Sequence, residues 1–147
     1  RLGVLRTYAT RHGPGPFPTE SNLDLDEPHN PPGAWQGAFR TGWLDAVLAR
    51  YAVAACGGID ALALTHCDRF RPGFRMARAY EGFEPALGPP RDLAHQEALG
   101  ARVASAKPVY DSFDTLDALG AALESELGAR VTMTSRGPTA SAKRFRS

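Results

Sequence analysis

Cysteine, histidine, long apolar runs and blocks of like charge are all scarce in this sequence. The two cysteines, Cys56 and Cys67, and four scattered histidines have a spacing that fits neither a disulfide framework nor a zinc site. No apolar run approaches the roughly 18 residues of a membrane span, and no signal-peptide core stands at the N-terminus. The 17 basic and 16 acidic residues nearly cancel, which argues against a nucleic-acid partner. We therefore expect a cytoplasmic protein without nucleic-acid or membrane partners.

The 147 residues, 43% of them hydrophobic, are enough for one sizeable core. The chain begins Arg1-Leu2-Gly3-Val4-Leu5, without methionine and directly in a strand-like run. This start predicts a piece of a longer protein whose upstream part is missing. The basic residues Lys143, Arg144 and Arg146 are expected to form a solvated terminus.

The first half of the chain predicts a strand, a helix and a second strand. The strand-like run is Leu2 to Ala9, and the buried strand is Ile59 to Thr65. Between them, a helix is expected to open at Thr41 as its cap, with Asp45 in its early turns and a stop at Gly57-Gly58. Its apolar stripe is expected to pack in the core: Trp43, Leu44, Val47, Leu48, Tyr51 and Ala54.

The second half of the chain also predicts alternating strands and helices. We expect a strand at Arg75–Glu81, a short helix at Asp92–Val103, an amphipathic helix at Ser112–Leu127 with a glycine stop, and a strand at Arg130–Thr134. Strands that alternate with helices indicate an α/β fold. The predicted fold is part of a mainly parallel sheet flanked by helices.

A long stretch, Thr10 to Arg40, is rich in proline, glycine and asparagine and is expected to be a loop. Three aromatic residues, Phe17, Trp35 and Phe39, argue against disorder. Its first part, T-R-H-G-P-G-P-F-P-T-E, is expected to be a rigid connector because proline fixes φ. Glu20, at its end, is expected to be a structural anchor.

Polar turns follow three of the predicted strands, at Thr10–Glu20, His66–Asp68 and Ser135–Thr139. In an open α/β sheet such turns share one edge, so one ligand can contact several of them. Taken alone, each turn is more typical of an ordinary turn or loop than of a ligand site. Common phosphate-loop, nucleophile-elbow and metalloprotease motifs are absent.

Taken in order, the motifs T-R-x-G-x-G-P-F-P-T-E, G-A-x-x-G, T-G-W-L-D-A-V, A-L-T-x-x-D, A-Y-E, P-V-Y and S-x-G-P resemble the C-terminal part of adenylosuccinate synthetase. The resemblance covers nearly the whole chain. It implies the C-terminal portion of a P-loop-NTPase-like synthetase over residues 1–147, a cytoplasmic homodimer that needs Mg²⁺. That family joins L-aspartate to IMP, with GTP first phosphorylating the 6-oxygen. Its catalytic residues, metal ligands and phosphate loop lie in the N-terminal part, so none is expected here.

The resemblance also implies nucleotide-binding positions. The turn that recognises guanine falls on His66, Cys67 and Asp68, with His66 in place of the family's lysine. A carboxylate accepts hydrogen bonds from guanine N1 and N2, which adenine does not offer. Further positions implied to contact the GTP base or the IMP ribose are Ser135, Arg136 and Gly137 for the base, and His12 and Gly13, through the backbone, for the ribose.

The amino-acid loop departs from the family pattern. The family's G-A-T-T-G-R-P-R-R-T-G-W corresponds here to G-A-W-Q-G-A-F-R-T-G-W, Gly33 to Trp43. Aligned from the left, Arg40 takes the place of the arginine that contacts both aspartate and GTP; aligned from the right, it does not. Another arginine, which contacts ribose and aspartate, is replaced by Ala38 or a gap. The implied substrate-binding loop is Trp35, Gln36, Gly37, Ala38, Phe39 and Arg40.

Losing a charged partner for a carboxylate costs about 1.5–3 kcal/mol per bond unless another group replaces it. Gln36 and the loop amides can hold aspartate instead. Alternatively, the nucleotide lacks a 2′-hydroxyl, as in the phage-type 2-aminoadenylosuccinate synthetases that act on dGMP. A third alternative, from another class, is a truncated, non-catalytic nucleotide-binding remnant. By itself the chain is expected to have no synthetase activity.

Overall fold

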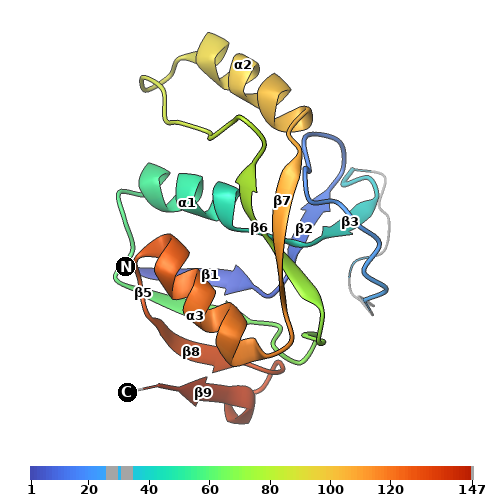
Figure 1. Cartoon of the computed structure of the whole chain (residues 1–147), viewed down its shortest axis with the longest axis vertical. Helices are drawn as coiled ribbons and strands as arrows, with labels where there is room; N and C mark the ends of the chain where they lie inside the picture. The colour runs from blue at the N-terminus through green and yellow to red at the C-terminus, as the bar shows by residue number, and fades with distance from the viewer. Residues whose placement is uncertain (26–29, 31–34, 147) are drawn as a thin grey trace.

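Strands and helices alternate along the chain (Figure 1). The computed structural model describes residues 1–25, 30 and 35–146. Its helices are α1 (Ala46–Ala55), α2 (Leu93–Ala104) and α3 (Leu116–Leu127), with a 3₁₀ turn η1 (Ala140–Ala142). Its strands are β1 (Leu2–Arg6), β2 (Ala9–His12), β3 (Phe39–Gly42), β4 (Leu44–Asp45), β5 (Ala61–Thr65), β6 (Phe74–Tyr80), β7 (Pro108–Phe113), β8 (Val131–Ser135) and β9 (Lys143–Phe145).

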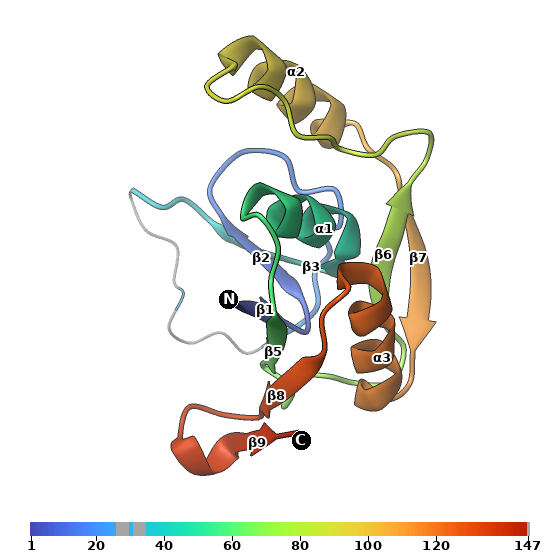
Figure 2. The same ribbon diagram turned by 90° about the vertical axis from the view of Figure 1, so that its left-hand side faces the viewer.

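The main sheet has the strand order β1-β5-β8-β9. Strands β1, β5 and β8 are parallel, and β9 runs antiparallel to β8. Helices α1 and α3 lie on the same side of these strands (Figure 2). The predicted fold class, a mainly parallel sheet flanked by helices, is therefore confirmed. A second, three-stranded sheet has the order β4-β6-β7.

The core lies between the main sheet, helices α1 and α3, and the second sheet. Strand β5 (A-L-A-L-T) is a continuous apolar run and is buried at its three central residues, as expected for an inner parallel strand. Helix α3 contributes its predicted leucine face, and Gly128 ends it in the left-handed conformation at φ 65°. The buried core cluster is Leu44, Ala46, Leu62, Leu64, Cys67, Met76, Leu119, Leu123, Leu127 and Val131.

The N-cap of helix α1 lies four residues later than the predicted cap, at Asp45 and not at Thr41. Asp45 Oδ1 accepts from the backbone N of Leu48 at 3.0 Å. Thr41 does not cap the helix: it belongs to β3, and its Oγ1 donates to the Ser21 carbonyl at 2.8 Å. Trp43 and Leu44 precede the helix, so the stripe is wrong in placing them on it, although Leu44 packs in the core as predicted. Ala54 is exposed, so the predicted core packing is wrong there.

Asp45 also joins α1 to β6. Its side chain is buried, and Tyr80 Oη donates to its second carboxylate oxygen at 2.5 Å. Burial raises the pKa of the Asp45 carboxyl above its ordinary value, although the Tyr80 and backbone hydrogen bonds oppose the shift. The same burial, with the nearby carboxylate, raises the pKa of Tyr80. The cap is therefore a buried acid with both oxygens occupied.

Two further predicted boundaries are wrong in part. Ser112 does not start α3, because residues 108–113 form β7, which pairs antiparallel with β6. The N-cap of α3 is Thr115, whose Oγ1 accepts from Ala118 N at 3.2 Å. The strand predicted at Leu2–Ala9 ends at Arg6, and a bend separates it from β2. The helix predicted at Asp92–Val103 is confirmed as α2, with Asp92 as its cap.

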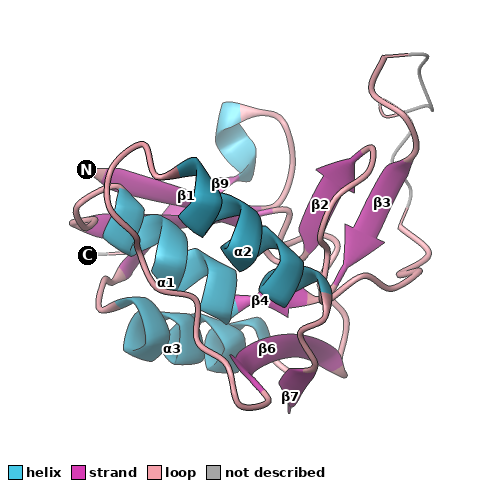
Figure 3. Cartoon of the chain, turned by 90° about the horizontal axis from the view of Figure 1, so that it is seen from above, coloured by secondary structure: helices cyan, strands magenta, loops and turns pink. Residues whose placement is uncertain are grey.

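The predicted loop from Thr10 to Arg40 contains strand residues at both ends. β2 pairs antiparallel with β3, so Arg11 lies opposite Arg40 and His12 opposite Phe39. Figure 3 shows this hairpin set apart from the helices. Part of the predicted loop, residues 26–29 and 31–34 with the motif residues Gly33 and Ala34, lies outside the described residues.

Candidate functional site

Two of the three predicted polar turns meet at the carboxyl end of the main sheet. Because β1, β5 and β8 are parallel, the residues that follow them lie at one edge, where ligands bind in open α/β sheets. We call this group the strand-end site. It consists of Thr7, Tyr8, His66, Cys67, Asp68, Ser135, Arg136 and Gly137.

Backbone hydrogen bonds hold the three strand ends together. Thr7 N donates to the Thr65 carbonyl at 3.1 Å, which joins β1 to β5. Cys67 N donates to the Ser135 carbonyl at 2.9 Å, which joins β5 to β8. Thr7 Oγ1 adds a bond to the His66 carbonyl at 3.0 Å. The edge is therefore preorganised by main-chain contacts.

His66 has a backbone conformation that is unusual for a residue with a side chain. Its φ is 56°, in the left-handed region, which costs about 1–3 kcal/mol. Its imidazole packs edge-on to the Tyr8 ring, with centroids 5.7 Å apart, and Nδ1 lies 3.2 Å from Thr65 Oγ1. The sharp turn at His66 carries the chain from β5 to Asp68.

Cys67 and Asp68 differ in what they offer a ligand. Cys67 is buried, and its Sγ donates to the Leu64 carbonyl at 3.3 Å. Burial raises the pKa of this thiol. Asp68 is exposed, and its carboxylate lies 3.3 Å from Arg69 Nε. Asp68 can therefore present a carboxylate to a ligand, whereas Cys67 contributes its backbone.

The turn after β8 is closed by its own contacts. Ser135 is buried, and its Oγ donates to the Gly137 carbonyl at 3.1 Å. Arg136 is exposed, and its backbone N donates to the Ala142 carbonyl at 3.0 Å. The turn is thus fixed in shape, and its residues lie beside the end of β5.

The third predicted turn belongs to the β2–β3 hairpin. We call the group His12, Gly13, Glu20, Gly37, Ala38, Phe39 and Arg40 the hairpin site. Gly13 N donates to the Ala38 carbonyl at 3.0 Å, and the His12 and Phe39 rings lie 5.0 Å apart. A Cβ on Gly13 would approach the Gln36 carbonyl to 2.9 Å, and φ is 67° there. The backbone pair at Gly13 therefore requires glycine.

The guanidinium of Arg40 donates hydrogen bonds to residues of this hairpin. Its Nε and Nη2 donate to the two carboxylate oxygens of Glu20, and its Nη1 donates to the carbonyls of Gly13 and Gly15 at 3.0 and 3.1 Å. The guanidinium also lies over the Phe17 ring, 5.3 Å from its centroid. The bond from Arg40 lowers the pKa of Glu20. This arrangement gives Glu20 the anchoring role that the sequence suggests.

The structure thus brings His12 and Gly13 next to Gly37, Ala38 and Phe39. The hydrogen-bond partners of Arg40 among the described residues come from the connector after β2, and none of them belongs to the strand-end site. Trp35 and Gln36 are exposed. The expectation that Thr10–Glu20 leaves the same edge as the other two turns is wrong, because β2 pairs with β3 in a separate sheet.

Sequence reasoning missed one contact at the strand-end site. The sequence predicts Lys143 as part of a solvated terminus, but this residue is half-buried and its Nζ donates to the Gly137 carbonyl at 2.6 Å. Arg144 and Arg146 are exposed, as expected. The short strand β9 has no periodic pattern, so nothing in the sequence separates Lys143 from its basic neighbours.

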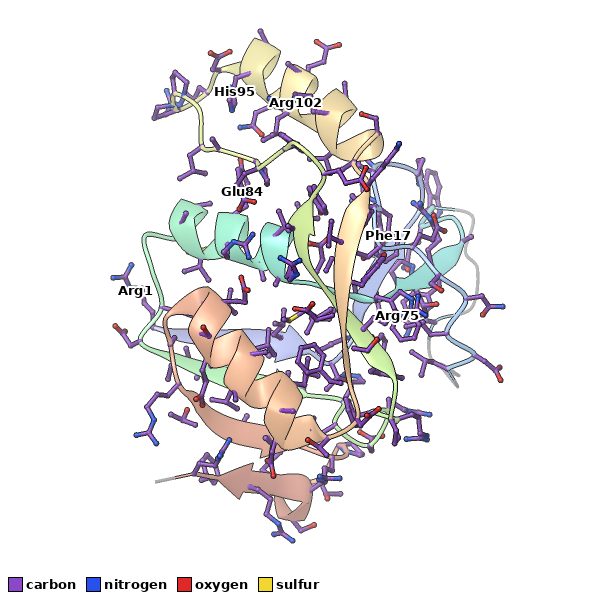
Figure 4. All side chains as sticks on the ribbon, in the orientation of Figure 1. Arg1, Phe17, Arg75, Glu84, His95 and Arg102 are labelled. Carbon is purple, nitrogen blue, oxygen red and sulfur yellow. The ribbon has the colours of Figure 1, made fainter. Side chains whose placement is uncertain are left out.

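Outside the strand-end site and the hairpin site, metal-binding clusters, membrane-spanning helices and cavities are the features of the described residues that could indicate a function. Within residues 1–25, 30 and 35–146, no three His, Cys, Asp or Glu side chains gather in a way that could hold a metal ion. No helix in the same part of the chain has the length and apolar composition to cross a membrane. A shallow cavity of about 130 Å³ lies between α2 and the segment before it, lined by Phe83, Glu84, His95 and Arg102 among others. Figure 4 shows the last three of these at the α2 end of the molecule.

Comparison with known proteins agrees with the motif resemblance. The family model described as adenylosuccinate synthetase matches residues 1–142. The adenylosuccinate synthetase of Desulforamulus reducens is 36% identical over 117 residues, covering 76% of this chain and 26% of the relative. That of Desulfovibrio desulfuricans is 35% identical over 160 aligned residues, covering 92% of this chain and 36% of the relative.

A solved structure has the same fold. The fully ligated adenylosuccinate synthetase from Plasmodium falciparum superimposes with a TM-score of 0.75 at 22% identity, covering 99% of this chain and 39% of that chain. The chain therefore spans between about a quarter and two fifths of the length of these proteins. On the family match and the fold together, the chain belongs to the adenylosuccinate synthetase family.

Proposed function

We propose that this chain supplies the nucleotide-base site and the amino-acid loop of a ligase of purine nucleotide synthesis. In the proposed reaction, L-aspartate is joined to IMP with hydrolysis of GTP. The observation that carries the proposal is the strand-end site: an exposed carboxylate, Asp68, stands beside the closed Ser135–Gly137 turn, and the Cys67–Ser135 hydrogen bond of 2.9 Å holds the two together.

The chemistry of the site fits a guanine base. An ionised carboxylate offers acceptors alone, and the N1 and N2 groups of guanine are donors. Adenine lacks this pair of donors and has an acceptor at N1. A carboxylate at this point therefore selects guanine, because it leaves adenine N1 without a hydrogen-bond donor. In the proposal Asp68 reads the base, with His66 and Cys67 shaping the turn and Ser135, Arg136 and Gly137 forming the opposite wall.

The hairpin site is proposed to hold the amino acid and to approach the nucleotide ribose. Trp35 and Gln36 are exposed, and residues 35–40 are proposed to contact L-aspartate. The backbone of His12 and Gly13 is proposed to approach the ribose. Arg40 is proposed to keep the loop in place and to bridge to aspartate or triphosphate if Glu20 releases it.

Magnesium is proposed as the cofactor of the whole enzyme, but the residues described here do not fit its site. Mg²⁺ prefers carboxylates and phosphate oxygens in octahedral geometry, and no carboxylate cluster exists among the described residues. We therefore assign no metal ligand to this chain. A cytoplasmic homodimer is likewise part of the proposal.

A chimaera provides the test. In the chimaera, this chain replaces the matching segment of the Desulfovibrio desulfuricans synthetase. The match between the two covers 92% of this chain. The proposal expects the chimaera to form adenylosuccinate from IMP, L-aspartate and GTP; the unmodified relative is the control. A folded chimaera that makes no product with any purine monophosphate would contradict the ligase proposal and would favour the non-catalytic remnant.

One observation favours a second candidate, the joining of aspartate to dGMP. All three guanidinium nitrogens of Arg40 have partners in the hairpin, and Ala38, two residues before it, carries no charge. A substrate without a 2′-hydroxyl needs fewer such donors. The same chimaera assayed with dGMP in place of IMP distinguishes the two candidates, because turnover of dGMP without IMP turnover would exclude the first.

A further inference from the structure

Lys143 is placed beside the strand-end site by the direction of β9. This strand runs antiparallel to β8, and Lys143 lies opposite Ser135 in their register. The first residue of β9 therefore lies at the same edge as the ends of β5 and β8. Figure 1 shows β9 at the outer side of β8.

The ammonium group of Lys143 contacts the Gly137 carbonyl directly. Nζ donates to Gly137 O at 2.6 Å, and Ser135 Oγ donates to the same oxygen at 3.1 Å. The Gly137 carbonyl thus accepts two hydrogen bonds. Lys143 is held at the wall of the site and does not extend into solvent as Arg144 does.

The Lys143 ammonium group has more N–H donors than the Gly137 carbonyl accepts. An ammonium group has three N–H bonds, and Gly137 accepts one of them. Within the described part of the chain Lys143 has no carboxylate partner closer than 4.0 Å. Because a half-buried cation gains by pairing with a polar acceptor, the remaining donors are suited to a ligand.

We propose that Lys143 donates a hydrogen bond to the 6-oxo group of a purine base bound at the strand-end site, at the O6 end of the same base edge that Asp68 contacts through N1 and N2. This inference rests on the proposed function. The base edge of guanine presents two donors and, beside them, the O6 acceptor; a carboxylate and an ammonium group complement that pattern. A 6-amino group, as in adenine, would direct its donors at the cation and be rejected.

The spacing of the strands agrees with this arrangement. β5, which leads to Asp68, and β9, which begins at Lys143, flank β8 on its two sides. Two inter-strand spacings amount to about 10 Å between backbones. That span accommodates a purine edge with a hydrogen bond of about 2.9 Å at either side.

The test compares Lys143→Met with the wild-type sequence, both placed in the chimaera described above, in calorimetric nucleotide titrations, with circular dichroism as the measure of folding. The two probes are GDP and 2-aminopurine riboside diphosphate, which lacks the 6-oxo group. We expect Lys143→Met to weaken GDP binding about tenfold, as for the loss of a hydrogen bond from a charged donor, with less than about a twofold change for the analogue. Lys143→Arg should keep most of the affinity, and Arg144→Met, which removes a charge from the same strand, should change neither probe.

Each other result has a definite meaning. Equal weakening of both probes by Lys143→Met would show that Lys143 only holds the Gly137 turn, and unchanged GDP binding would show that it has no role; both overturn the inference. A circular dichroism spectrum of Lys143→Met that matches the wild type, or recovery in Lys143→Arg, excludes misfolding as the cause. A folded chimaera with the wild-type sequence that binds no purine nucleotide overturns the proposed function and this inference with it, whereas binding insensitive to Lys143 overturns the inference alone.

Discussion

Arg40 and Glu20 form a two-pronged ion pair across the hairpin, with Arg40 Nε 2.7 Å from Glu20 Oε1 and Nη2 2.5 Å from Oε2. The same guanidinium binds two carbonyls of the connector through Nη1. One side chain thus fixes the path of a proline-rich segment against β3. An arginine that resembles a substrate-binding residue is engaged, in this state, in organising the loop.

Replacing Glu20 by Gln should cost about 1 kcal/mol of unfolding free energy at neutral pH, because the pair is partly exposed but has bidentate geometry. Arg40 lowers the pKa of Glu20 below its ordinary value of 4.5. The stabilisation is therefore complete above that value and is lost as the pH falls through the lowered pKa. Urea unfolding of both proteins, at neutral pH and at about pH 3, measures this. Equal unfolding free energies of the wild type and Glu20→Gln at neutral pH would contradict a stabilising role of the Arg40–Glu20 ion pair.

Asp45 should respond oppositely to pH. Burial raises its pKa above the ordinary value of 3.8, so its contribution to stability is greatest below that value and declines as the pH rises through the raised pKa. Asp45→Asn keeps the cap and can pair with Tyr80, so we expect a change within about 1 kcal/mol and a loss of this pH dependence. Asp45→Ala removes the cap and leaves Tyr80 unpaired, at a cost of about 2–3 kcal/mol. Thermal unfolding at several pH values measures the stability of both variants. Equal losses of stability in Asp45→Asn and Asp45→Ala would refute the role of Asp45 as a helix cap and as the partner of Tyr80.

Gly13→Ala should be markedly destabilising, by about 2 kcal/mol or more, because it adds a collision with the Gln36 carbonyl to an unfavourable φ. Gly82→Ala is the matched control: its φ is 61°, but no atom lies within 4 Å of the added Cβ. It should lose about 1 kcal/mol, from backbone strain alone. Urea midpoints of the two variants compare them, and equal losses would mean that the close approach at Gly13 has no energetic weight.

Asp68→Asn should weaken GDP binding about tenfold and leave ADP binding nearly unchanged, because the amide replaces one acceptor by a donor facing guanine N1 and N2. Isothermal titration of the chain with both nucleotides measures the effect. Asp68→Glu, which retains the carboxylate, is the control for loss of charge. An unchanged preference for GDP over ADP would reduce Asp68 to a turn residue.

The sequence predicts what depends on local pattern and misses what depends on distant pairing. Strand β5, helix α2 and the leucine face of α3 follow from continuous apolar runs and helical spacing. The start of α1 does not, because Thr41 is a good local cap but its hydroxyl bonds to Ser21, and β3 pairs with β2. Strand β7 has no counterpart in the sequence prediction, and its last two residues, Ser112 and Phe113, fall in the predicted helix Ser112–Leu127. Its partner β6 lies between 28 and 39 residues earlier in the register, from Tyr80–Pro108 to Phe74–Phe113.

The candidate sites depend on resemblance more than on spacing. Turn composition points to His66–Asp68 and Ser135–Thr139, and parallel topology explains why these two meet. The roles given to Trp35 through Arg40 come from a family pattern that this chain follows only in part. Lys143 was missed because its position is set by a three-residue strand that pairs with β8, and composition alone does not distinguish it from a charged tail.

Cys67 provides an internal reporter for the strand-end site. Its thiol is buried and donates to the Leu64 carbonyl, while its backbone N donates to the Ser135 carbonyl, which is one of the hydrogen bonds between the ends of β5 and β8. Cys56, in contrast, is exposed. A thiol reagent should therefore modify Cys56 at once and Cys67 only when the two strands separate. The rate of the slow reaction measures how often this edge of the sheet opens, and a nucleotide that bridges the two strands would slow it.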